Sequence, residues 1–249
     1  MQILLMTAVA GIAGMGLGAL VAAVLGRTSE RVMSAMLSFA GGVMIAIVGF
    51  ELVPEAVELG GLAASAGGLV LGIAVVMILH RLVDRLKISG GPLHAGAQTG
   101  NPRLLRSGII MLVAIALHNV PEGIAIGAAA THDMFMGMVL AAIILLHCIP
   151  EGIAVAAPLI GGGMSRAKAV WLTALSGAPT ILGGAIGMAV GGISEAALAV
   201  ALAGAGGAML YVVFSELLPQ SAHLTRSHLT TAVPALVGIL VGLIITSVH

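Results

Sequence analysis

Two neighbouring apolar segments carry almost the same residues, LHNVPEGIAIG from Leu117 to Gly127 and LHCIPEGIAVA from Leu146 to Ala156. In each copy the histidine and the glutamate are four residues apart, so on a helix they lie on one face. The proline before each glutamate has no backbone N–H and leaves a carbonyl of the preceding turn without its helical partner. The repeat therefore predicts two helices that each present an imidazole and a carboxylate side by side.

The rest of the chain has the composition of an integral membrane protein. Of its 249 residues 59% are hydrophobic and only 8% are charged, and the mean hydropathy is +1.18. A helix needs about 20 apolar residues to cross the hydrocarbon core. We expect an all-α, single polytopic domain over residues 1–249, with a cytoplasmic loop at 84–103. The eight predicted transmembrane helices are 2–25, 32–58, 61–83, 104–130, 134–160, 167–191, 196–222 and 229–248.

The basic residues predict how these helices are oriented. If the eight helices are correct, every Lys and Arg falls in or beside loops on one side, and cytoplasmic loops are the ones that gather positive charge. Both termini are then extracytoplasmic, and we expect a multi-pass protein of the plasma (inner) membrane without nucleic-acid partners. The ten residues are Arg27, Arg31, Arg81, Arg85, Lys87, Arg103, Arg106, Arg166, Lys168 and Arg226.

Glycine is abundant, with 36 residues, and some glycines are spaced as GxxxG. This spacing allows two membrane helices to approach closely. General helix packing explains the spacing more simply than a dedicated dimer face. The four pairs are Gly14/Gly18, Gly68/Gly72, Gly183/Gly187 and Gly238/Gly242.

Acidic residues, unlike basic ones, occur inside the apolar segments, where a charge costs at least about 2.5–3.5 kcal/mol. No Lys or Arg is available there, so protons, hydrogen bonds or a bound cation must compensate the charge. These residues are Glu51, Glu55, Glu122, Glu151 and Glu216.

The duplicated motif favours the cation. The two helices are joined by a short connection, so they run antiparallel and bring His118 level with Glu151 near the bilayer midplane. Two imidazoles and two carboxylates, from His118, Glu122, His147 and Glu151, then converge. This set suits Zn²⁺, with Cd²⁺, Fe²⁺, Mn²⁺ and Co²⁺ as alternatives.

A second set of donors lies beside the first. Asn119 and Cys148 precede the two glutamates by three residues and can approach the same carboxylates from another side, so the glutamates could bridge two ions. A cysteine thiolate would be a soft ligand, but a buried free cysteine is as often an inert small hydrophobic residue.

Another pair of segments echoes each other, FELVPEA from Phe50 and FSELLPQSA from Phe214. Glu51 matches Glu216, and Pro54 matches Pro219. The matched helices are an odd number of helices apart, so they run in opposite directions. This pattern is typical of inverted repeats in transporters.

On these motifs the chain resembles a bacterial member of the ZIP (Zrt/Irt-like) family of metal transporters. The resemblance implies eight helices in a 3+2+3 arrangement, a homodimer, and uptake of Zn²⁺ or related ions by alternating access. Helices 1, 4, 5 and 6 would move against helices 2, 3, 7 and 8. It also implies metal contacts from His118, Asn119, Glu122, His147, Glu151 and Met44, with Glu51, Glu55 and Glu216 along the pathway.

Two departures from the family pattern put a complete second metal site in doubt. Ala178 stands before Pro179 where many relatives carry an acid, and Cys148 replaces a carboxylate or amide. Two rival functions use the same residues: an intramembrane metalloenzyme and a proton-conducting channel. The chain lacks HExxH and the paired ExxH of di-iron bundles, and a proton relay leaves the matched His/Glu spacing unexplained.

Overall fold

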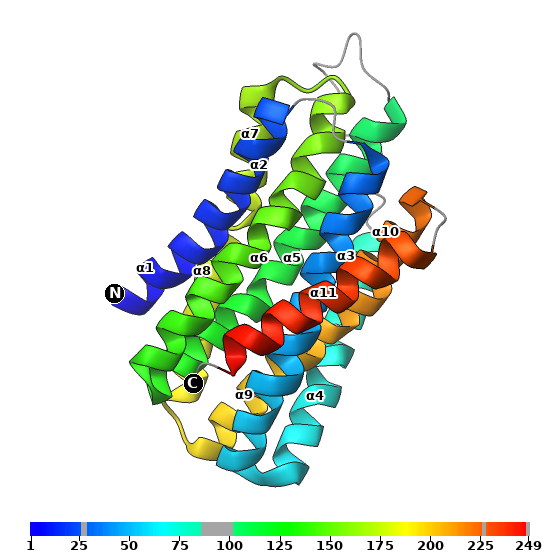
Figure 1. The fold of residues 1–249 in the computed structure, drawn as a ribbon. Helices are drawn as coiled ribbons and strands as arrows, with labels where there is room; N and C mark the ends of the chain where they lie inside the picture. Colours follow the sequence, from blue (N-terminus) through cyan, green and yellow to red (C-terminus); the bar gives the residue numbers. More distant parts are fainter. Residues whose placement is uncertain (26–28, 86–101, 226–227, 248–249) are drawn as a thin grey trace.

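A computed structural model of the chain describes residues 1–25, 29–85, 102–225 and 228–247, and all regular structure in them is helical (Figure 1). Most of the predicted loop 84–103 lies outside the described residues, as do Arg27, Lys87 and Arg226. The elements, with π-helical turns written η, are α1 Gln2–Ala8, η1 Val9–Ala13, α2 Gly14–Leu25, α3 Glu30–Ile47, η2 Val48–Leu52, α4 Val53–Arg85, α5 Pro102–His132, α6 Met134–Gly161, α7 Arg166–Ser176, α8 Pro179–Gly191, α9 Glu195–Val212, η4 Val213–Leu217, α10 Leu218–Thr225 and α11 His228–Thr246.

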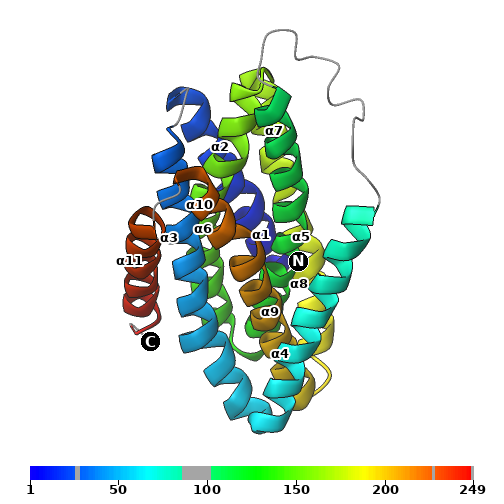
Figure 2. The ribbon, with the colours of Figure 1, turned by 90° about the vertical axis from the view of Figure 1, so that its right-hand side faces the viewer.

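Within the described residues, six helical runs are long and apolar enough to cross a membrane, which confirms the all-α membrane class. One of them, Glu30–Ile78, contains a break at Gly61, where φ is +74°. Figure 2 shows the chain reversing there, and the part of α4 that follows runs back along α9. A shorter apolar helix covers His228–Ile244. The number of eight transmembrane helices stays a prediction.

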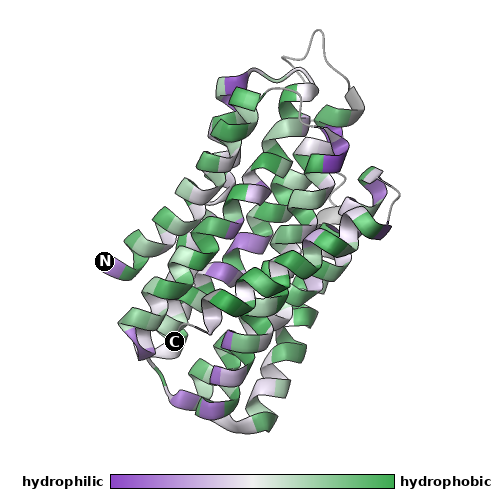
Figure 3. Ribbon diagram, viewed as in Figure 1, coloured by the Kyte–Doolittle hydropathy of each residue, from purple (hydrophilic) through white to green (hydrophobic). Residues whose placement is uncertain are grey.

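The helices pack in pairs. α5 packs against α8, and α6 packs against α2, while α5 and α6 also contact each other. In the other half of the bundle α3 packs against α11, and α4 packs against α9. Figure 3 shows helices dominated by hydrophobic residues, with hydrophilic residues at helix ends and midway along α5 and α6.

The predicted glycine pairs make these contacts close. Added methyl groups at each of the four pairs would overlap a neighbouring helix of the same chain. Between lipid-embedded helices the hydrophobic effect contributes little, so small residues that bring backbones together supply much of the packing. The partners are α6 for Gly14 and Gly18, α9 for Gly68 and Gly72, α5 for Gly183 and Gly187, and α3 for Gly238 and Gly242.

A buried group of hydroxyls joins α3 to α10. Ser34 Oγ donates to the carbonyl of Ser221 at 3.0 Å, and Ser221 Oγ donates to the carbonyl of Ser34 at 2.9 Å. Ser38 Oγ also lies within hydrogen-bond distance of Ser221 Oγ. Polar contacts of this kind act as a second means of holding membrane helices together.

The helix ends that carry the described Lys and Arg residues share one end of the bundle. These are the N-termini of α3, α5 and α7 and the C-terminus of α4 (Figures 1 and 2). The grouping agrees with the alternation of loops expected from the basic residues. Which side of the membrane this end faces stays a prediction.

Gly72→Ala tests whether backbone contact between helices holds the bundle together. Its methyl group would overlap the carbonyl oxygen of Gly204 on α9, and overpacking costs about 1–3 kcal/mol. We expect a lower thermal midpoint for the detergent-solubilised protein, followed by size-exclusion chromatography after heating. Gly67→Ala is the control, because a methyl group there meets open space. Equal midpoints for the two variants would contradict the packing argument.

Candidate metal centre

The four residues of the duplicated motif lie at the contact between α5 and α6. His118 and Glu122 are one turn apart on α5, and His147 and Glu151 are one turn apart on α6. Both helices continue through Pro121 and Pro150. No more than 1% of any of the four residues is exposed.

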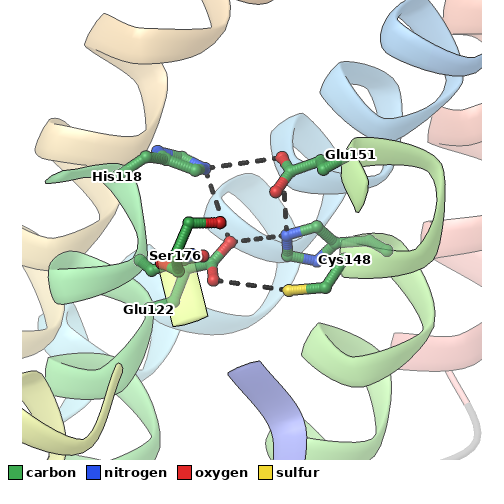
Figure 4. Close-up of polar contacts among 7 residues, drawn as sticks. His118, Glu122, Cys148, Glu151 and Ser176 are labelled. Carbon is green, nitrogen blue, oxygen red and sulfur yellow. Dashed lines mark hydrogen bonds and ion pairs between the residues drawn. The ribbon is translucent and has the colours of Figure 1, made fainter. Parts of the chain in front are cut away.

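The imidazole nitrogens and carboxylate oxygens converge on one point (Figure 4). His118 Nε2 lies 3.4 Å from Glu122 Oε1 and 3.7 Å from Glu151 Oε1. His147 Nε2 lies 4.0 Å from Glu151 Oε1 and forms a hydrogen bond of 2.6 Å with Glu122 Oε1. One ligand atom from each residue therefore lies within 4.8 Å of the other three.

These distances can be compared with those in a tetrahedral zinc site. With Zn–N and Zn–O bonds of about 2.0–2.2 Å, two ligand atoms are about 3.3–3.6 Å apart. Three of the His–Glu separations, 3.4, 3.7 and 4.0 Å, are equal to this spacing or slightly longer. The fourth is shorter because His147 and Glu122 are hydrogen-bonded directly, and an ion between the helices would replace that bond.

The electrostatic environment also fits a cation. Within the described residues, the ion pairs of Glu122 and Glu151 are with histidines, and no Lys or Arg contributes. Both carboxylate oxygens of Glu151 and both ring nitrogens of His118 are buried without a hydrogen-bond partner. Buried polar atoms normally have partners, so this cluster has the donors and the charge for a divalent ion.

Asn119 contacts a different helix from the one that the His and Glu side chains of the cluster face. Its Nδ2 donates to the carbonyl of Ser176 at 2.8 Å, while its Oδ1 is buried without a partner. The helix that contains Ser176 is interrupted at Gly177 and Ala178, and α8 begins at Pro179. Because the amide nitrogen holds this interrupted helix, only the amide oxygen of Asn119 is left for an ion.

Cys148 lies beside the four. Its Sγ is 3.7 Å from Glu122 Oε2 on the neighbouring helix, and the side chain is fully buried (Figure 4). Met44 is fully buried in α3 and belongs to the same hydrophobic cluster as Cys148. The thiol therefore contacts Glu122 on the opposite helix, whereas the glutamate three residues after it in the sequence is Glu151.

The remaining acids lie outside this cluster. Glu51 and Glu216 are half-buried and occupy the same position in two π-helical turns, VGFEL in η2 and VFSEL in η4. Glu55 is half-buried in the first turn of α4. The two similar segments, FELVPEA and FSELLPQSA, therefore also share a π-helical backbone at the matching glutamate.

The sequence motifs did not predict the contacts of the Ser176 carbonyl or of the hydroxyls of Ser34, Ser38 and Ser221. The SGAPT segment carried a signal for the first, since Gly177 and Pro179 together favour an interrupted helix. The spacing of Ser34 and Ser38 places both on one helix face, but their partner on α10 is far away in sequence.

Together, the apolar helices and the buried His/Glu cluster define a polytopic membrane protein with the ligand set of a divalent metal site. A family model described as ZIP zinc transporter matches residues 91–249. The zinc transporter ZupT of Akkermansia muciniphila is 35% identical over 99% of this chain and 95% of that protein. Those of Corynebacterium efficiens and Escherichia fergusonii are 34% and 32% identical, over 94% and 90% of this chain and 91% and 88% of theirs.

The chain therefore belongs to the ZIP family, as the motifs indicated. Its relatives are transporters rather than enzymes, and with its apolar helices the chain is a multi-pass protein of the plasma membrane. Nothing in the site or the comparisons favours the metalloenzyme or the proton channel.

Removing either imidazole tests the cluster as a binding site. We expect His118→Ala and His147→Ala each to weaken Zn²⁺ binding at least about tenfold, since even the loss of a group that only orients a ligand costs about 10–100-fold. Equilibrium dialysis of the purified protein against ⁶⁵Zn²⁺ measures the affinity. His228→Ala, an exposed histidine at the start of α11, is the control. Unchanged affinity in the first two variants would exclude the cluster as the principal site.

Proposed function

We propose that this protein carries Zn²⁺ from outside the cell into the cytoplasm, with His118, Glu122, His147 and Glu151 as the ligands in transit. The convergence of these four buried side chains is the observation that supports this proposal most directly. The ion is the substrate rather than a resident cofactor, so the site must both bind and release it.

The proposal of zinc rests on ligand type and on the relatives. Two imidazoles and two carboxylates suit a borderline divalent ion. The three relatives named above are zinc transporters. Cd²⁺, Fe²⁺, Mn²⁺ and Co²⁺ accept the same ligands, so we expect them to compete. An inside-negative membrane potential favours inward movement of a divalent ion by about 4.6 kcal/mol per 100 mV.

The packing of the helices supports eight transmembrane helices in a 3+2+3 arrangement with both termini outside. An inverted repeat pairs predicted helix 1 with 6, 2 with 7, 3 with 8 and 4 with 5. In the structure these pairs are α2 with α8, α3 with α9, α4 with α11, and α5 with α6. The contact of α5 with α8 in one repeat therefore corresponds to the contact of α6 with α2 in the other. In the same way, the contact of α3 with α11 corresponds to that of α9 with α4. The matched π-helical turns η2 and η4 follow the same exchange.

The same contacts suggest how access to the site alternates. α2, α5, α6 and α8 form one packed group around the site. The second group consists of two packed pairs, α3 with α11 and α4 with α9, which meet through the π-helical turns η2 and η4. In the proposed mechanism the first group shifts against the second and opens the site to one side at a time. We assign the second group to the contact in a homodimer, as the family resemblance implies.

A cavity of about 690 Å³ supports a release route at the end that carries the basic residues. It lies between α5 and the segment formed by η4 and α10, and Glu216 is part of its wall. Met111 and Ala114, also in the wall, precede His118 on the same face of α5. Glu51 and Glu55 lie toward the opposite end, where we propose that the ion enters.

Transport itself is tested in proteoliposomes. We expect Glu122→Ala combined with Glu151→Ala to abolish ⁶⁵Zn²⁺ uptake, because both carboxylates of the site are lost. Glu195→Gln is the control, since Glu195 is an exposed acid at the start of α9. Uptake by the double variant at the wild-type rate would refute the proposed function. An imposed inside-negative potential is expected to raise the wild-type rate.

Cys148→Ser tests the thiol as a soft ligand at the edge of the site. Sulfur ligands favour Cd²⁺ over Zn²⁺, and the Sγ of Cys148 contacts Glu122. We expect Cd²⁺ to compete less well for ⁶⁵Zn²⁺ uptake in this variant, while uptake of zinc alone persists. A competition curve that matches the wild type would make Cys148 a packing residue.

A further inference from the structure

A second imidazole and carboxylate face each other away from the central site. His132, the last residue of α5, places Nε2 at 3.7 Å from Oε1 of Glu55 in the first turn of α4. The side chains are 43% and 25% exposed, respectively. The pair thus joins two helices from distant parts of the sequence at a place that solvent can reach.

The separation fits a shared ion better than a direct bond. At 3.7 Å the two atoms are beyond hydrogen-bond distance. They are close to the spacing of about 3.3–3.6 Å between two ligands of a tetrahedral Zn²⁺. The donors are of the same two kinds as in the central cluster, and their partial exposure leaves room for water molecules as the other ligands.

The surroundings favour a cation. The C-terminus of α5, the N-terminus of α9 and the turn at Gly61 share the end of the bundle opposite the described Lys and Arg residues (Figures 1 and 2). Exposed acids at this end are Glu58, Asp133 and Glu195. Asp133 also caps α6 by accepting from the N–H of Phe135. A group of negative charges raises the local concentration of a divalent ion.

The pair is separate from the central cluster. Glu51 precedes Glu55 by about one helical turn and is half-buried in η2. His132 and His118 are on the same helix, fourteen residues apart, which corresponds to about 21 Å. An ion held at Glu55 and His132 is therefore too far away to touch the central ligands.

We propose that Glu55 and His132 form an external docking site that binds a partly hydrated divalent cation before it moves to the central cluster. This inference rests on the proposed transport function and deepens it. The site adds affinity for the ion outside the central cluster. It therefore increases uptake at low metal concentration and leaves the maximal rate unchanged.

The first test measures binding without the central site. In the Glu122→Ala, Glu151→Ala protein we expect one weak ⁶⁵Zn²⁺ site by equilibrium dialysis. Adding His132→Ala should weaken it at least about tenfold. Adding His228→Ala, an exposed histidine at the start of α11 outside the proposed pathway, should not. Residual binding that His132→Ala leaves unchanged would overturn the docking site without affecting the proposed function.

The second test measures uptake in proteoliposomes with the central site intact. We expect His132→Ala and Glu55→Gln to raise KM for Zn²⁺ severalfold at an unchanged maximal rate, as expected when binding outside the rate-limiting step is lost. Glu30→Gln should leave KM unchanged, because Glu30 is an exposed acid at the start of α3, at the opposite end of the bundle. A fall in the maximal rate at constant KM would contradict the docking role.

The double variant Glu55→Gln, His132→Gln separates metal docking from helix attachment. Two amides keep a polar, hydrogen-bonding contact between α4 and α5 but are poor ligands for Zn²⁺. We expect KM to rise as in the single variants. Wild-type KM in the double variant would show that the pair only holds the helices together and would overturn the proposal.

Discussion

Buried negative charge without a fixed positive partner is the constraint around which this protein is built. Glu122 and Glu151 are fully buried, and the described ion pairs of both are with histidines. A lone carboxylate in an apolar medium is strongly disfavoured, so each glutamate needs a proton, a hydrogen bond or an ion. A lysine would satisfy the charge permanently, whereas a mobile divalent ion can satisfy it and then leave.

The close packing of the bundle serves this constraint. α5 and α6 must hold four side chains within a few ångströms, and each is supported by a helix that approaches through glycine: α8 against α5, and α2 against α6. Backbone contacts of this kind leave little room for adjustment, since a carbonyl cannot turn aside as a side chain can. The geometry of the site therefore depends on residues that carry no functional group.

Much of this could be predicted from local patterns in the sequence. The repeated histidine and glutamate gave the site, because a spacing of four on a helix fixes which side chains meet. The glycine spacing predicted close contacts between helices, but it did not predict which helices make them. The bond from Asn119 to Ser176 and the pair formed by Glu55 and His132 could not be predicted, because each joins segments whose spatial relation depends on the whole topology.

The hydrogen bond between His147 and Glu122 gives this carboxylate a partner within the protein itself. A carrier that moves one ion inward must return empty, and an exposed pair of bare carboxylates would make that return costly in lipid. In the proposed mechanism, the pairing of Glu122 with an imidazole from the opposite helix would cover part of that charge during the return. An ion at the proposed site would have to replace this hydrogen bond, so the protein's own imidazole would lower the affinity for the ion and ease its release.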